Sequence, residues 1–163
     1  MDEVIAVALI AGIVLGTALW LAALTPRGRQ AASVGLLLAL GLIAVMTLLP
    51  TGSVTASVNL DPGAGLAAPW RSPTSAVNIV GNLLLFVPLG VALPACLPVL
   101  RSPVLAVPVA AAVSVLVELT QYAYVAGRAT DVNDVLLNTA GALAGLVAFR
   151  AVRAVTDRTP VQA

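Results

Sequence analysis

The chain has 163 residues, of which 60% are hydrophobic and only 9% are charged. A soluble domain is about half apolar and about one quarter charged, so the excess apolar surface is expected to lie in lipid. The formal net charge is +1, with eight arginines and no lysine, which excludes a strongly basic nucleic-acid surface. The chain has no histidine, which excludes mechanisms that need one as general base or zinc ligand.

Five apolar stretches are each long enough to cross the bilayer core, which takes about 20 helical residues. They cover Val4–Leu24, Ala31–Leu49, Ile79–Leu100, Val104–Val125 and Val135–Val152. The third contains Pro88, Pro94 and Pro98, and each proline removes a backbone donor, so this helix is expected to be kinked or partly broken. The sequence therefore predicts an all-α, polytopic membrane bundle of five transmembrane helices, with residues 1–163 in a single domain.

The charges near these stretches predict the orientation. Asp2 and Glu3 precede the first stretch, which is longer than a signal-peptide core, so we expect a retained helix with the N-terminus outside. Basic residues concentrate on the cytoplasmic side of membrane proteins. In this orientation the inner side holds Arg27, Arg29, Arg101, Arg150, Arg153 and Arg158, and the outer side holds Arg71 and Arg128. The tail over residues 153–163 is then cytoplasmic.

Residues 50–75 form the longest hydrophilic stretch and are expected to be an extracytoplasmic loop. This stretch is rich in Gly, Pro, Ser and Thr, and it contains the turn signal Asp61-Pro62-Gly63. The composition fits a flexible surface loop, and a lid over a substrate is the alternative.

Eight polar residues follow one another in order between Ala76 and Gly145, and nearly all of them lie inside or at the edges of the last three apolar stretches. They are Asn78, Asn82, Glu118, Gln121, Arg128, Asp131, Asp134 and Asn138. Ionisable groups at membrane depth are costly unless they pair or face a polar cavity, so they indicate a functional site. In the predicted orientation they belong to the outer ends of three helices. We therefore expect them to gather just beneath the extracellular surface.

These residues belong to two motifs with fixed spacing. The motifs are Asn78-x3-Asn82-x3-Phe86-x-Pro88-x-Gly90 and Glu118-x2-Gln121-x6-Arg128-x2-Asp131-x2-Asp134-x3-Asn138-x2-Gly141-x3-Gly145. In this order they resemble the VanZ-like family of small bacterial membrane proteins, over roughly residues 34–150. The founding member of that family is associated with low-level resistance to the glycopeptide teicoplanin. The resemblance thus implies a multi-pass protein of the bacterial plasma membrane that acts at the cell envelope.

Two interpretations of the polar set stay open. In a structural one, Glu118 pairs with Arg128, Asp131 caps the fifth helix, and Asn82 and Gln121 bond neighbouring helices. In a functional one, the carboxylates outnumber Arg128, and the surplus indicates an outward-facing polar pocket.

Such a pocket would suit a lipid or lipid-linked headgroup, a glycopeptide, a cationic group, or Mg²⁺ or Ca²⁺; no metal site or cofactor is assigned. A binding protein is favoured because it needs no catalyst. The alternatives are a lipid-modifying enzyme with Glu118 as acid or base, although Ser114 and Thr120 lack a basic partner, and a small transporter. The pair Gly141-x3-Gly145 can let helices approach closely, either within the chain or in a dimer, so the oligomeric state stays open.

Overall fold

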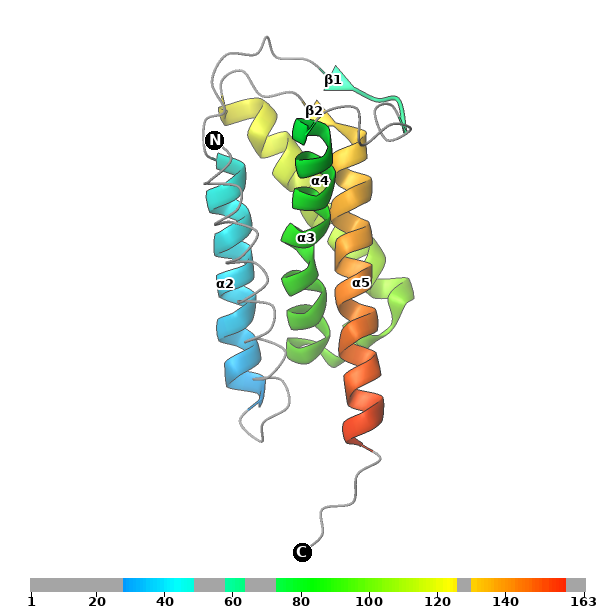
Figure 1. The fold of residues 1–163 in the computed structure, drawn as a ribbon. Helices are drawn as coiled ribbons and strands as arrows, with labels where there is room; N and C mark the ends of the chain where they lie inside the picture. Colours follow the sequence, from blue (N-terminus) through cyan, green and yellow to red (C-terminus); the bar gives the residue numbers. More distant parts are fainter. Residues whose placement is uncertain (1–27, 49–57, 64–72, 126–129, 158–163) are drawn as a thin grey trace, which may run out of the picture.

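The computed structural model describes residues 28–48, 58–63, 73–125 and 130–157. Four helices make up most of this part of the chain. They are α2 (Gly28–Leu48), α3 (Pro73–Cys96), α4 (Pro103–Tyr124) and α5 (Val132–Thr156). A short 3-10 turn, η2 (Pro98–Arg101), links α3 to α4, and α4 crosses behind α3 and α5 (Figure 1).

Three of these helices are long and apolar enough to cross a membrane. Their apolar parts are Ser75–Cys96, Pro103–Tyr124 and Val132–Thr156, with mean hydropathies of 2.1, 2.0 and 1.7. The apolar part of α2 that the structure describes, Ala32–Thr47, is shorter. The all-α prediction is confirmed. The predicted first span, Val4–Leu24, lies outside the described residues, so the five spans and their orientation stay predictions.

The third helix is displaced from its predicted position. It begins at Pro73 and ends at Cys96, whereas the apolar run predicted Ile79–Leu100. Pro98 accounts for the earlier end, because a residue before proline avoids helical geometry, and Leu97 is extended with φ −120° and ψ 95°. The helix continues through Pro88 and Pro94, so these prolines do not divide the span, and the kink stays a prediction.

The backbones of α3 and α5 lie in direct contact at three glycines. A Cβ atom added to Gly141 would lie 1.9 Å from the carbonyl oxygen of Leu83, and one added to Gly145 would lie 2.2 Å from that of Val87. Gly90 on α3 meets the carbonyl oxygen of Ala142 in the same way, at 2.0 Å. Glycine lets the two backbones touch here. The Gly141-x3-Gly145 pair therefore serves packing within the chain.

The helices are arranged so that one end of the bundle is acidic. At this end α2 and α4 finish and α3 and α5 begin, and we call it the acidic end (Figure 1). It also carries a feature that the sequence did not predict, a two-residue parallel pairing of β1 (Val58–Asn59) with β2 (Thr130–Asp131). At the opposite, basic end, Arg29 lies in the first turn of α2, Arg101 closes η2, and Arg150 and Arg153 lie in the last two turns of α5.

Candidate functional site

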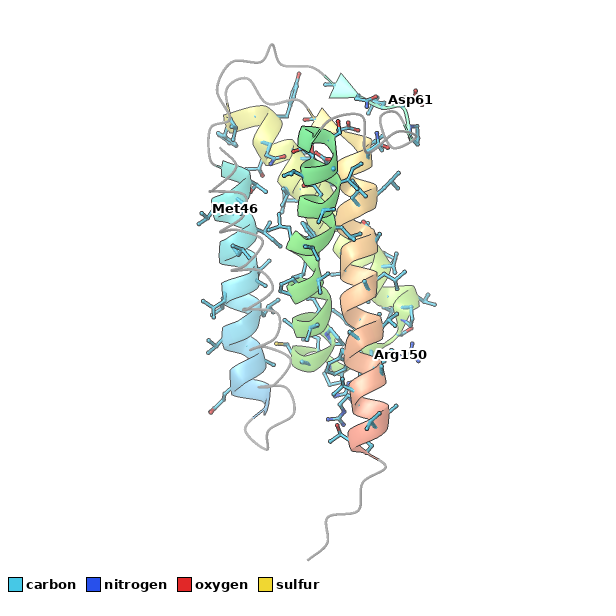
Figure 2. All side chains as sticks on the ribbon, viewed as in Figure 1. Met46, Asp61 and Arg150 are labelled. Atoms are coloured by element: carbon cyan, nitrogen blue, oxygen red, sulfur yellow. The ribbon has the colours of Figure 1, made fainter. Side chains whose placement is uncertain are left out.

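Apart from Arg128, which lies outside the described residues, the polar residues that the sequence singled out gather at the acidic end. The site is built on rigid elements, because its side chains come from the first turns of α3 and α5 and the last turns of α4. Figure 2 shows oxygen and nitrogen atoms clustered there around the labelled Asp61, while the labelled Arg150 lies toward the other end. The predicted convergence of three helices is thus observed for the residues that the structure describes.

Asn82 and Asp134 connect α3 to α5 at this end. The side-chain nitrogen of Asn82 donates a hydrogen bond to Oδ1 of Asp134, and both residues are half-buried. Asn78 lies one turn nearer the start of α3 and is exposed. The spacing of four along α3 therefore produces one residue in the interhelical contact and one at the surface.

Asp131 is the centre of the hydrogen-bond network. Its Oδ1 accepts bonds from the backbone and side-chain nitrogens of Asn133, both at 2.8 Å, which confirms the predicted N-cap of α5. Its Oδ2 accepts a 3.1 Å bond from the side chain of Asn59. Its own backbone amide donates to Oε2 of Glu118 at 3.3 Å. One residue therefore connects α4, α5 and the segment before α3.

Glu118 is buried, with 4% of its surface exposed, and Gln121 one turn later is 3% exposed. The side-chain nitrogen of Gln121 donates a 3.3 Å hydrogen bond to the backbone oxygen of Thr47, near the end of α2. Hydrogen bonds of this kind hold membrane helices together. The structural role predicted for Gln121 is therefore confirmed.

A second polar pair lies one helical turn deeper, between α4 and α5. The side-chain nitrogen of Asn138 donates a 2.9 Å bond to Oγ of Ser114, and the two residues are 2% and 0% exposed. Within the described part of the chain, Oδ1 of Asn138 has no hydrogen-bond partner. Ser114 lies four residues before Glu118 on α4, and Asn138 lies four residues after Asp134 on α5, so polar groups continue inward along both helices.

Residues 58–63 are attached to the start of α5. The backbone pairing places Val58 beside Thr130 and Asn59 beside Asp131. Beyond it, the side chain of Asn133 contacts the turn twice: Nδ2 donates to the oxygen of Asp61 at 3.2 Å, and Oδ1 accepts from the amide of Gly63 at 2.7 Å. Gly63 adopts φ +93°, which favours glycine. We call residues 58–63 the strap.

The structure adds residues to the site that the sequence argument missed. They are Thr47, Asn59, Asp61, Ser114 as a hydrogen-bond partner, and Asn133. Asn133 is two residues from Asp131, so it does not share the spacings of three and four residues that relate the predicted site residues. Arg128, with its predicted ion pair to Glu118, lies outside the described residues. In the part of the chain that is described, no three His, Cys, Asp or Glu residues are placed to hold a metal ion.

The chain matches a known protein family. The model of the VanZ/LLP1 family matches residues 36–153, which is well over half of the chain. The chain belongs to the VanZ/LLP1 family. A search of curated proteins and a search of solved structures each gave no significant match. Both sets of polar residues, those of α3 and those of α4 and α5, lie inside the matched region, and the three apolar helices agree with a VanZ-family membrane protein.

Proposed function

We propose that this VanZ-family protein binds the polar headgroup of a lipid or lipid-linked cell-wall precursor at its acidic end, on the outer face of the plasma membrane. The observation that carries the proposal is the gathering of three carboxylates at one end of an apolar bundle. Glu118 comes from α4, and Asp131 and Asp134 come from the start of α5. Asp131 and Asp134 are half-buried, so their oxygens lie near the boundary between the bundle and its surroundings.

The chemistry of the site favours a ligand that donates hydrogen bonds. Carboxylate and amide oxygens accept bonds, and charge-assisted bonds to hydroxyl or N–H groups are stronger than neutral ones. A headgroup made of sugars and a peptide carries many such donors. Ser114 also fits a binding role better than a catalytic one. Its Oγ accepts a hydrogen bond from the side-chain nitrogen of Asn138, and an amide nitrogen cannot act as the base that activates a serine nucleophile.

The distribution of charge supports an outward-facing site. Among the residues described, the arginines lie at the end opposite to Glu118, Asp131 and Asp134. Basic residues favour the cytoplasmic side, so the acidic end is expected outside. A site there could alter how a glycopeptide such as teicoplanin reaches its target. This expectation follows from the association of the family's founding member with teicoplanin resistance.

Direct binding tests this function. Purified protein in lipid nanodiscs is titrated with a lipid-linked cell-wall precursor, and separately with teicoplanin. Asp134→Asn keeps an oxygen for Asn82 but removes the charge, and a lost charge-assisted bond of about 1.5–3 kcal/mol should weaken precursor binding by about tenfold or more. Asp157→Asn is the matched control, because Asp157 is exposed and pairs with Arg153 at the basic end.

The outcome is read in cells as well. A teicoplanin-sensitive bacterium that expresses the wild-type chain should become less susceptible, and Asp134→Asn should abolish the change at equal protein level. Teicoplanin binding without precursor binding would make the antibiotic itself the ligand. If neither compound binds the wild-type protein and susceptibility does not change, the proposed function is wrong.

A further inference from the structure

The strap is held at the acidic end by hydrogen bonds, with little apolar burial. Val58 is 53% exposed and Leu60 is 74% exposed, so its hydrophobic side chains contribute little to its attachment. A two-residue pairing is also far shorter than a stable strand. Segments held by few buried apolar contacts open at low free-energy cost. Among the segments that the structure describes at this end, the strap is therefore easily released.

The side chain of Asn133 holds the strap through two hydrogen bonds. It is 3% exposed, and both atoms of its side-chain amide contact the backbone of the turn, at Asp61 and Gly63. Release of the strap would break both of these hydrogen bonds, while Nδ2 of Asn133 keeps its bond to Oδ1 of Asp131. The two hydrogen bonds therefore oppose release of the strap. Release is reversible if a polar group of a ligand takes the place of the turn's backbone at Asn133.

The strap is also connected to the buried carboxylate. Asn59 on the strap donates to Asp131, and the backbone amide of Asp131 donates to Glu118. Release of the strap would remove the Asn59 partner from Oδ2 of Asp131 and expose the start of α5. A ligand that donates hydrogen bonds could take the position of the Asn59 amide.

We propose that the strap closes the acidic end, that Asn133 is its latch, and that a headgroup reaches Glu118 only when Asn133 releases residues 61–63. This inference rests on the proposed function, and it names the element that controls entry to that site. Because the latch is a single side chain on α5, the proposal is tested by one substitution.

Access to position 118 is measured without any ligand. Glu118→Cys in a Cys96→Ala background is labelled with a membrane-impermeant maleimide. Asn133→Ala should make labelling at least about tenfold faster, because two hydrogen bonds that oppose opening are lost. Thr139→Ala is the matched control, since its hydroxyl bonds Val135 on the same helix and not the strap. Equal labelling rates with and without Asn133→Ala would show that Asn133 does not hold the strap closed over position 118.

A second variant avoids any change at Glu118. Val58→Cys and Thr130→Cys face each other in the pairing, and adjacent strands lie about 4.8 Å apart, within the range of a disulfide. In the Cys96→Ala background the oxidised form should lose binding of the lipid-linked precursor by about tenfold or more, and reduction should restore it. Equal precursor binding by the oxidised and reduced forms would overturn the closure. Faster labelling combined with no precursor binding by any form would support the closure and overturn the proposed function.

Discussion

The backbone amide of Asp131 donates a 3.3 Å hydrogen bond to Glu118 and so joins the start of α5 to the last turns of α4. Glu118 is 4% exposed, so its removal would leave polar groups without their partners in a place that water reaches poorly. The two residues are 13 positions apart, and this contact fixes how the two helices meet at the acidic end.

Glu118→Ala should therefore destabilise the protein more than Glu118→Gln. Glutamine keeps an oxygen that accepts the bond from Asp131, whereas alanine removes it at a cost of about 1–3 kcal/mol. Unfolding in mixed detergent micelles, followed by circular dichroism, measures the difference. If alanine and glutamine lower the free energy of unfolding equally, the bond to Asp131 does not contribute to stability.

Gly141→Ala should be destabilising because the added Cβ would lie 1.9 Å from the carbonyl oxygen of Leu83. The atom it meets is backbone, so α3 and α5 must separate, and overpacking of this kind costs about 1–3 kcal/mol. Gly81→Ala on α3 is the matched control: among the described residues, no atom beyond its own helical turn lies within 4 Å of its added Cβ. That substitution should gain about 0.5–1 kcal/mol from helix propensity. Equal effects at the two glycines would contradict the close contact.

The helical part of the fold was largely predictable because apolar length decides it. The runs Ala31–Leu49, Val104–Val125 and Val135–Val152 correspond to α2, α4 and α5 within several residues at their ends. For the run at Ile79–Leu100, the predicted helix ends were both wrong, because α3 covers Pro73–Cys96. Hydropathy extends it past Pro98, where the backbone geometry before proline ends the helix. Residues Pro73–Asn78, which include the polar Thr74, Ser75 and Asn78, are helical although the predicted apolar run begins after them.

The candidate site was predictable only where its residues follow a helical spacing. Asn82, Asp134 and Asn138 were found in this way, and the structure places them in contacts between helices. The strap was not, because Asn59 and Asp131 are 72 residues apart and belong to no repeating pattern. Contacts between a loop and a helix end depend on the folded chain. A single sequence contains no periodic signal for them.

Ser114 and Asn138 should be coupled in their effect on stability. Their hydrogen bond is fully buried, and such bonds between membrane helices contribute about 0.6–2 kcal/mol. Ser114→Ala and Asn138→Ala should each destabilise the protein, and the double variant should cost less than the sum of the two. A double-mutant cycle on the free energy of unfolding measures the coupling. Strict additivity would show that the bond contributes nothing.

Asp131→Ala should weaken α5 and release the strap together. The carboxylate caps the helix at Asn133 and accepts the bond from Asn59, and loss of an N-cap costs about 0.5–2 kcal/mol. Asp131→Asn separates the two roles, since asparagine is an equally good cap, but the amide nitrogen that replaces Oδ2 cannot accept the bond from Asn59. Hydrogen exchange should speed up over both residues 58–63 and residues 130–134 in the alanine variant, and over residues 58–63 alone in the asparagine variant. Unchanged exchange in both would rule out Asp131 as the link between the strap and α5.

The two ends of the bundle should face opposite sides of the membrane. In the Cys96→Ala background, Asn59→Cys on the strap and Ser102→Cys in the exposed turn before α4 place single thiols at the acidic and basic ends. Because basic residues favour the cytoplasmic side, intact spheroplasts should label position 59 with an impermeant maleimide and leave position 102 unlabelled until they are lysed. The control is labelling of both positions at equal rates in detergent. Labelling of position 102 before lysis would show that the orientation is the opposite of the one proposed. Glu118 and Asp131 would then lie on the cytoplasmic side, away from any extracellular headgroup.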